Sequence, residues 1–218
     1  MTGLRRANNV YTLICDEPGN IVAEAARRGE QVTAYSRTAP TQPVDGVTYV
    51  QGDVLDTGFL DEVVDGADVV VHALSPRGEL EGRLEKVAAE VAERAGRARV
   101  RLGVVGAAGS LKAAPGGPAL YQSPDTPEQF RAEGRTMHTI LEALRNSPPA
   151  LDWFYLSPDP GFGAYAPGQA TGRFRLGGDV LRTDDVGPSG ISGADFATAL
   201  VDELEAPRHH REQFSVAY

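Results

Sequence analysis

One cysteine, Cys15, occurs in the 218 residues, which excludes an internal disulfide and a metal site built from clustered cysteines. No apolar run approaches the roughly 20 residues of a membrane-spanning helix, and residues 1–9 lack the apolar centre of a signal peptide. The 21 lysines and arginines are outnumbered by 30 aspartates and glutamates, so the formal net charge is −9. Nucleic-acid binding needs a basic face. We therefore expect a cytoplasmic protein whose partners are neither nucleic acids nor membranes.

The chain opens with a strand, a turn, a helix and a second strand. Residues 10–15 form a short apolar run rich in β-branched and aromatic side chains, which is typical of a buried parallel strand. Residues 21–28 have a helical pattern that stops at Gly29, and residues 31–36 form the next strand. A β-α-β opening of this kind is the first half of a mononucleotide-binding unit.

Strands and helices alternate through the rest of the chain. Further strands are predicted at residues 47–51, 67–74, 100–106 and 151–156, and helices at 55–64, 79–97, 127–146 and from 192 onward. The alternation predicts one α/β domain with a Rossmann-like, doubly wound parallel sheet and helices on both faces. Residues 8–150 would form the nucleotide-binding core. Residues 151–218 would form a small substrate-side part, with a hairpin around residues 176–178 and an edge strand at 214–217.

The turn after the first strand lacks the glycines that a dinucleotide fingerprint, G-x-G-x-x-G, requires for close approach to pyrophosphate. Between residues 4 and 28 the chain has one glycine, Gly19, and two carboxylates, Asp16 and Glu17, stand where phosphate would lie. These carboxylates either oppose phosphate binding or stabilise the positive end of the helix that follows. The prediction of the fold is unaffected, whereas binding of NADP(H) is doubtful.

Several segments together resemble a protein family: IVAEAARRGEQVTAYSR, GVTYVQGDVLD, GADVVVHAL, VVGAAGSL, LDWFYLSP, TGRFRLGGD and ISGADFATALVDELE. In order and spacing they are similar to the atypical short-chain dehydrogenase/reductase group of NAD(P)H-binding proteins, which includes NmrA-like and NADH-flavin-reductase-like proteins. The resemblance covers nearly the whole chain from Ile21 onward. It implies a Rossmann-like fold with a nicotinamide dinucleotide at the carboxyl ends of the strands.

By this resemblance, Ser36 and Arg37 would meet the adenosine ribose, and Asp53 and Val54 would lie against the adenine. An arginine after the second strand favours a 2′-phosphate, and therefore NADP over NAD, because a guanidinium binds phosphate with two donors. An ordinary solvated arginine is the alternative. The other cofactor-binding residues that we predict are Gly19, Asn20, Ala73, Leu74, Ser75 and Gly106.

The Tyr-x-x-x-Lys pair that donates a proton in typical short-chain reductases is absent, and the corresponding helix has Phe130 and Gly134 instead. Ser110 and Tyr121 are the candidate catalytic hydroxyls, although a helix-cap serine and a packed tyrosine are equally ordinary roles. Substrate-pocket candidates are Ala108, Phe162 and Tyr165.

The four histidines do not have the spacing of metal ligands, so no metal site is predicted. His72 is expected to be a packed residue within a strand, and His138 a surface or satisfied histidine on a helix. His209 and His210 are interpreted as a solvated connection. Tyr155, within the 151–156 strand, is expected in the core.

Three functions fit these observations, each with a small-molecule partner and each compatible with a homo-oligomer. The first is an NAD(P)H-dependent reductase acting on a small apolar, quinone or flavin substrate. The second is a cofactor-independent isomerase, cyclase or dehydratase that has kept the fold and lost the dinucleotide. The third is a non-catalytic NmrA-like sensor or regulator.

Overall fold

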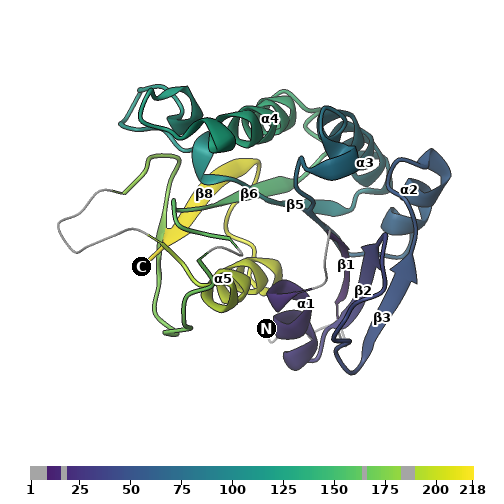
Figure 1. Cartoon of the computed structure of the whole chain (residues 1–218). Helices are drawn as coiled ribbons and strands as arrows, with labels where there is room; N and C mark the ends of the chain where they lie inside the picture. Colours follow the sequence, from purple (N-terminus) through teal and green to yellow (C-terminus); the bar gives the residue numbers. More distant parts are fainter. Residues whose placement is uncertain (1–8, 16–18, 164–165, 183–189) are drawn as a thin grey trace, which may run out of the picture.

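The computed structural model describes residues 9–15, 19–163, 166–182 and 190–218. In these ranges, eight strands form one sheet with the order β3-β2-β1-β4-β5-β6-β8-β7 (Figure 1). Neighbouring strands are parallel except for β7, which runs antiparallel to β8. The strands are β1 (Val10–Cys15), β2 (Gln31–Ser36), β3 (Val47–Gln51), β4 (Val69–Ala73), β5 (Arg101–Val105), β6 (Trp153–Pro158), β7 (Arg175–Gly177) and β8 (Glu212–Ala217). The first six positions of the sheet have the Rossmann order, which confirms the predicted fold class.

Helices cover both faces of the sheet (Figure 1). One face carries α2 (Thr57–Val64), α3 (Leu84–Ala98) and α4 (Glu128–Arg145), and the other carries α1 (Asn20–Arg27) and α5 (Gly193–Glu205). Three short 3₁₀ segments complete the set: η1 (Gly78–Leu80), η2 (Ala108–Ser110) and η3 (Leu120–Gln122). No helix in the described ranges combines the length and the hydropathy needed to cross a membrane.

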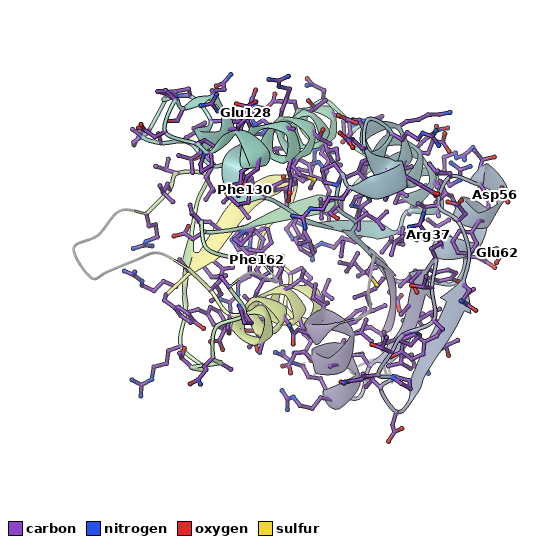
Figure 2. All side chains as sticks on the ribbon, viewed as in Figure 1. Arg37, Asp56, Glu62, Glu128, Phe130 and Phe162 are labelled. Carbon is purple, nitrogen blue, oxygen red and sulfur yellow. The ribbon has the colours of Figure 1, made fainter. Side chains whose placement is uncertain are left out.

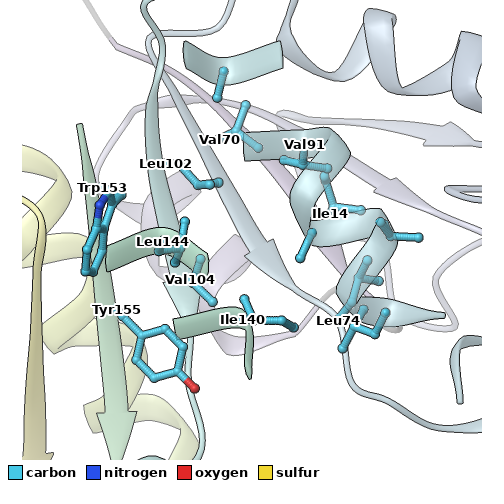
Figure 3. Close-up of a cluster of buried hydrophobic side chains, with 14 of the residues drawn as sticks. Ile14, Val70, Leu74, Val91, Leu102, Val104, Ile140, Leu144, Trp153 and Tyr155 are labelled. Carbon is cyan, nitrogen blue, oxygen red and sulfur yellow. The ribbon is translucent and has the colours of Figure 1, made fainter. Parts of the chain in front are cut away.

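The core has two layers because consecutive strand residues point to opposite faces. In β6, Trp153 and Tyr155 pack under α3 and α4, while Phe154 and Leu156 pack under α1 and α5. Figure 3 shows the first of these layers, in which Ile140 and Leu144 of α4 lie near the two β6 aromatics. A strand covered on both faces must be apolar throughout, which explains why the central strands have no alternating pattern.

Most elements lie where the sequence predicts them, and β1, β2 and β3 have the predicted bounds. Two predictions for the C-terminal part are wrong. The predicted hairpin around residues 176–178 does not form: residues 175–177 pair with β8, and the backbone of Lys112 is hydrogen-bonded to Asp179 and Leu181. The strand at 214–217 is not an edge strand: β8 begins at Glu212 and lies between β6 and β7, buried from Gln213 onward.

Candidate functional site

A small cavity of about 100 Å³ lies at the carboxyl ends of four neighbouring strands, β3, β2, β1 and β4. In a doubly wound sheet this edge is where ligands bind. The residues that line the cavity are Cys15, Tyr35, Ser36, Arg37, Thr38, Gly52, Asp53, Val54, Leu55, Leu74, Arg77, Glu79 and Leu80. Five of the predicted cofactor-binding residues are therefore brought together here: Ser36, Arg37, Asp53, Val54 and Leu74.

The end of β2 turns its serine inward and its arginine outward. Ser36 is buried, and its hydroxyl donates to the carbonyl of Thr38 at 2.7 Å, which fixes the turn after the strand. The Arg37 side chain is 61% exposed, and its Nη1 lies 2.5 Å from Oε2 of Glu79 on η1. Figure 2 shows Arg37 on the side of the molecule that carries α2. The guanidinium therefore borders the cavity with a carboxylate as its partner.

The end of β3 forms the adjoining wall. Asp53 is exposed, and its Oδ1 accepts a hydrogen bond from the backbone of Leu55 at 2.9 Å, which turns the chain toward α2. Gly52 is required by packing, since a Cβ at this position would lie 2.0 Å from the Phe59 ring. That ring meets the edge of Tyr35, with ring centroids 5.4 Å apart. Tyr35 lines the cavity together with apolar side chains: Val54, Leu55, Leu74 and Leu80.

The N-terminus of α1 is where the pyrophosphate of a bound dinucleotide is expected. Gly19 is the N-cap residue and Asn20 the first helical residue, and both are exposed. Asp16 and Glu17 lie outside the described residues. The first turn of α1 has no acidic side chain. A Cβ at Gly193 would lie 2.3 Å from Nδ2 of Asn20, so the N-termini of α1 and α5 lie side by side.

The loop after β5, residues 106–110, would by the resemblance line the reaction end, where the nicotinamide of the cofactor meets the substrate. This loop packs around Tyr155, which is fully buried as expected. Its hydroxyl donates to the carbonyl of Met137 at 3.1 Å and accepts from the backbone of Ala107 at 3.3 Å. Because the single phenolic proton is used in this way, Ser110 donates to the phenol oxygen at 2.9 Å. Burial raises the pKa of Tyr155 to about 12 despite these hydrogen bonds. The Ser110 side chain, 2% exposed, is therefore held inside a structural network.

The other residues predicted for the nicotinamide half of the cofactor and for the adjoining substrate pocket are half-buried: Ala73, Ser75, Gly106 and Ala108. Packing requires a glycine at position 106, because a Cβ there would lie 2.1 Å from Cε1 of Tyr155. These four residues stand outside the lining of the cavity at β1 to β4.

Tyr121, in η3, packs against α4. Its Cβ would be 2.7 Å from a Cβ at Gly134, and its ring centroid is 5.3 Å from that of His138, one turn further along the helix. The tyrosine lines a surface hollow together with Arg131 and Arg135, and no predicted cofactor-binding residue lines that hollow. The geometry favours packing, and a catalytic role for Tyr121 stays a prediction.

Phe162 follows β6 and packs against Phe196 of α5, with ring centroids 4.6 Å apart. Figure 2 shows Phe162 near α5, away from Arg37. The side chain of Phe162 is half-buried. Tyr165, the other aromatic candidate, lies outside the described residues.

The interpretation of His209 as a solvated residue is wrong. Its Nδ1 lies 2.8 Å from the buried Glu203 carboxylate, and its ring stacks on Phe214 at 3.7 Å. Glu203 also accepts from Nη2 of Arg101 at 2.7 Å. This buried cluster joins β5, α5 and β8 at the edge of the sheet opposite the cavity. No cluster of three or more metal-ligating side chains occurs among the described residues.

Comparison with known proteins identifies the family. A family model described as NAD(P)H-binding matches residues 19–207. The chain belongs to this NAD(P)H-binding family. It is also 31% identical over 198 residues to the uncharacterized protein YwnB of Bacillus subtilis, covering 90% of this chain and 91% of that one.

Two crystal structures extend the similarity of this NAD(P)H-binding chain to its three-dimensional form. A candidate epimerase from Bacteroides thetaiotaomicron is 33% identical with a TM-score of 0.83, over 97% of each chain. A candidate NADH-flavin reductase from Streptococcus pneumoniae is 28% identical with a TM-score of 0.80, over 96% of this chain and 99% of that one.

Sequence reasoning missed two charged residues of the cavity, Arg77 and Glu79. Both follow the carboxyl end of β4, and charged residues just beyond a strand of a parallel sheet are a usable signal for a site. The pairing of Glu79 with Arg37 spans 42 residues, and no local pattern reports such a contact.

Proposed function

We propose that this chain is an NAD(P)H-dependent reductase acting on a small apolar substrate of the quinone or flavin type. One observation carries the proposal: in a chain of the NAD(P)H-binding family, the cavity at the carboxyl ends of β1 to β4 keeps the residues predicted for the adenosine half of the cofactor. The turn after β1 lacks the glycines of the fingerprint, so the proposal depends on the residues predicted for the adenosine half.

The residues of the cavity fit the adenosine end of NADPH. Val54 and Leu74 supply an apolar wall for the adenine, and the guanidinium groups of Arg37 and Arg77 suit a 2′-phosphate. The first turn of α1 itself has no acidic side chain, although the preceding turn carries Asp16 and Glu17, whose charge opposes a phosphate. When bound, NAD(P)H would supply a hydride to the substrate.

The two hydroxyls of the loop region around Tyr155 favour a substrate that needs no proton from a protein side chain. The phenol of Tyr155 has its pKa raised to about 12 by burial and is fully engaged in hydrogen bonds, as is the hydroxyl of Ser110. Quinones and flavins become anionic on accepting a hydride and take their proton from water. The described residues would then bind and orient the two reactants, with Phe162 providing an apolar contact.

The first test is a calorimetric titration of the purified protein with NADPH and with NADH, followed by loss of nicotinamide absorbance when a quinone is added. Arg37→Ala should weaken NADPH binding by about tenfold to a hundredfold, because a charge-assisted hydrogen bond to phosphate is lost, and should leave NADH nearly unaffected. The control is Arg97→Ala, which removes an exposed cation outside the cavity. Failure of both nucleotides to bind the wild-type protein refutes the proposal.

A second candidate function is a cofactor-independent isomerisation, cyclisation or dehydration in the same cleft. The observation that favours it is the turn itself, which has Asp16 and Glu17 in place of glycines. A carboxylate at the phosphate position could act as a general base if buried. Turnover by dialysed protein without any nucleotide would separate this function from the reductase.

A further inference from the structure

Each arginine of the cavity already has a carboxylate partner. Arg37 pairs with Glu79, and Arg77 pairs with Glu133 of α4 through Nη2 at 2.8 Å. The two partners differ in position: Glu79 lines the cavity, whereas Glu133 stands outside its lining. A phosphate that approaches Arg37 therefore meets the negative charge of Glu79 as well.

The position of Glu79 is fixed by its neighbours in η1. Leu80, the next residue, is 8% exposed and packs in the core layer under α3 and α4. Gly78, the residue before, has φ +58°, a backbone conformation that side chains other than glycine rarely adopt. The backbone N–H of Leu80 donates to the carbonyl of Arg77 at 3.2 Å, which closes the turn. Glu79 is thus held at the edge of the cavity by a buried anchor on one side and a required turn on the other.

The Arg37–Glu79 ion pair is exposed to solvent, so another anion can replace the carboxylate on the guanidinium. Its side chains are 61% and 64% exposed, and exposed ion pairs contribute little net free energy. A phosphate can therefore displace the carboxylate from the guanidinium at low cost. The displaced carboxylate remains attached to η1, which lines the same cavity, so its charge still repels the phosphate.

Both residues of the pair line a small cavity. The cavity volume of about 100 Å³ is well below the roughly 300–1,000 Å³ of ligand pockets. The contact at 2.5 Å joins the segment after β2 to the segment after β4 across this cavity.

We propose that Glu79 is a specificity-determining residue that competes with the 2′-phosphate for Arg37 and so reduces the preference of this chain for NADPH over NADH. The inference rests on the proposed function, because it concerns the cofactor of the same site. Among the charged side chains that line the cavity, two arginines are balanced by two carboxylates, Asp53 and Glu79. Removal of the Glu79 charge leaves Arg37 without a competing carboxylate on η1.

The test measures dissociation constants of NADPH and NADH by calorimetry for wild type, Glu79→Gln and Glu81→Gln. Glu81 is the matched control, since it is exposed, lies two residues further on and is not part of the cavity lining. Glu79→Gln should tighten NADPH binding by about three- to tenfold and change NADH binding by less than about twofold. Glu81→Gln should change neither by more than about twofold.

A double-mutant cycle isolates the contact. In the Arg37→Ala background, Glu79→Gln should change the NADPH-to-NADH ratio by clearly less than it does in the wild type, because the arginine for which the two anions compete is gone. An unchanged ratio in Glu79→Gln, or an equal gain in Glu81→Gln, overturns the inference while leaving nucleotide binding intact. Absence of binding of either nucleotide by wild type and variants alike overturns the reductase proposal and this inference together.

Discussion

Replacement of Glu203 by glutamine should lower the free energy of unfolding by about 3 kcal/mol at neutral pH. The side chain is 4% exposed, and its carboxylate accepts from Nη2 of Arg101 at 2.7 Å and from Nδ1 of His209 at 2.8 Å. Removing one charge of a buried pair costs about 3–5 kcal/mol because the other charge stays buried. The lower end applies here, since Arg101 keeps Asp152 as a partner at 3.2 Å and glutamine keeps one acceptor oxygen.

The effect should depend on pH in a defined direction. Burial alone would raise the pKa of Glu203, but hydrogen bonds from Arg101 and from the backbone and ring of His209 hold it below its usual range. A carboxyl group with a lowered pKa in the folded state stabilises the protein fully above its unfolded pKa. That stabilisation is lost as the pH falls below about 4.3, the ordinary value for glutamate, and through the folded pKa. The difference between wild type and Glu203→Gln should therefore shrink in acid.

Urea unfolding followed by circular dichroism measures both effects. With a slope of about 1–3 kcal/mol per molar urea, a loss of 3 kcal/mol lowers the midpoint by about 1–3 M. Glu93→Gln is the control, because Glu93 is 66% exposed in its pair with Arg97 and should change stability by less than about 0.5 kcal/mol. A loss below about 1 kcal/mol for Glu203→Gln, or a loss that is the same at neutral and acid pH, would refute the reasoning.

Two further substitutions test packing and hydrogen bonding, both by thermal unfolding. Gly134→Ala should destabilise the protein even though alanine favours helices, because the new Cβ would lie 2.7 Å from Cβ of Tyr121. Gly96→Ala is the control: its Cβ would make only an ordinary contact at 3.6 Å, and the substitution should stabilise α3 by about 0.5–1 kcal/mol. Equal changes in melting temperature for the two variants would contradict the predicted steric clash at position 134. Tyr155→Phe should cost about 1–3 kcal/mol, since it leaves the buried Ser110 hydroxyl without its acceptor. An unchanged melting temperature would contradict that network.

The order of the helices and strands could be predicted because the sequence pattern that marks each one lies within its own residues. Strand β1 is a largely apolar run with clear ends, and the helices between strands have an apolar face of period 3.6. The partner of β7 was not predictable, because pairing of residues 175–177 with β8 joins segments almost 40 residues apart. The backbone of Lys112, far away in the sequence, takes the partners that a hairpin would have used.

The cavity shows the same division between local and distant information. Ser36, Arg37 and Asp53 follow their strands directly, so their arrival at one edge of the sheet follows from parallel topology. The Arg37–Glu79 contact and the burial of His209 against Phe214 depend on which side chains the fold brings together. Charge pattern alone predicts neither.

The loss of the Tyr-x-x-x-Lys pair has a structural consequence that bears on the chemistry. Gly134, where the lysine would stand, lies against Tyr121 and the backbone of Gly109, and a Cβ there would be 3.3 Å from Cα of Gly109. A lysine could not be restored at this position without displacing η2 and η3. Packing therefore excludes a lysine side chain at position 134, and the hydroxyl of Tyr155, which is buried, already donates to the carbonyl of Met137. Under the proposed reductase function, both constraints favour a hydride acceptor that takes its proton from water.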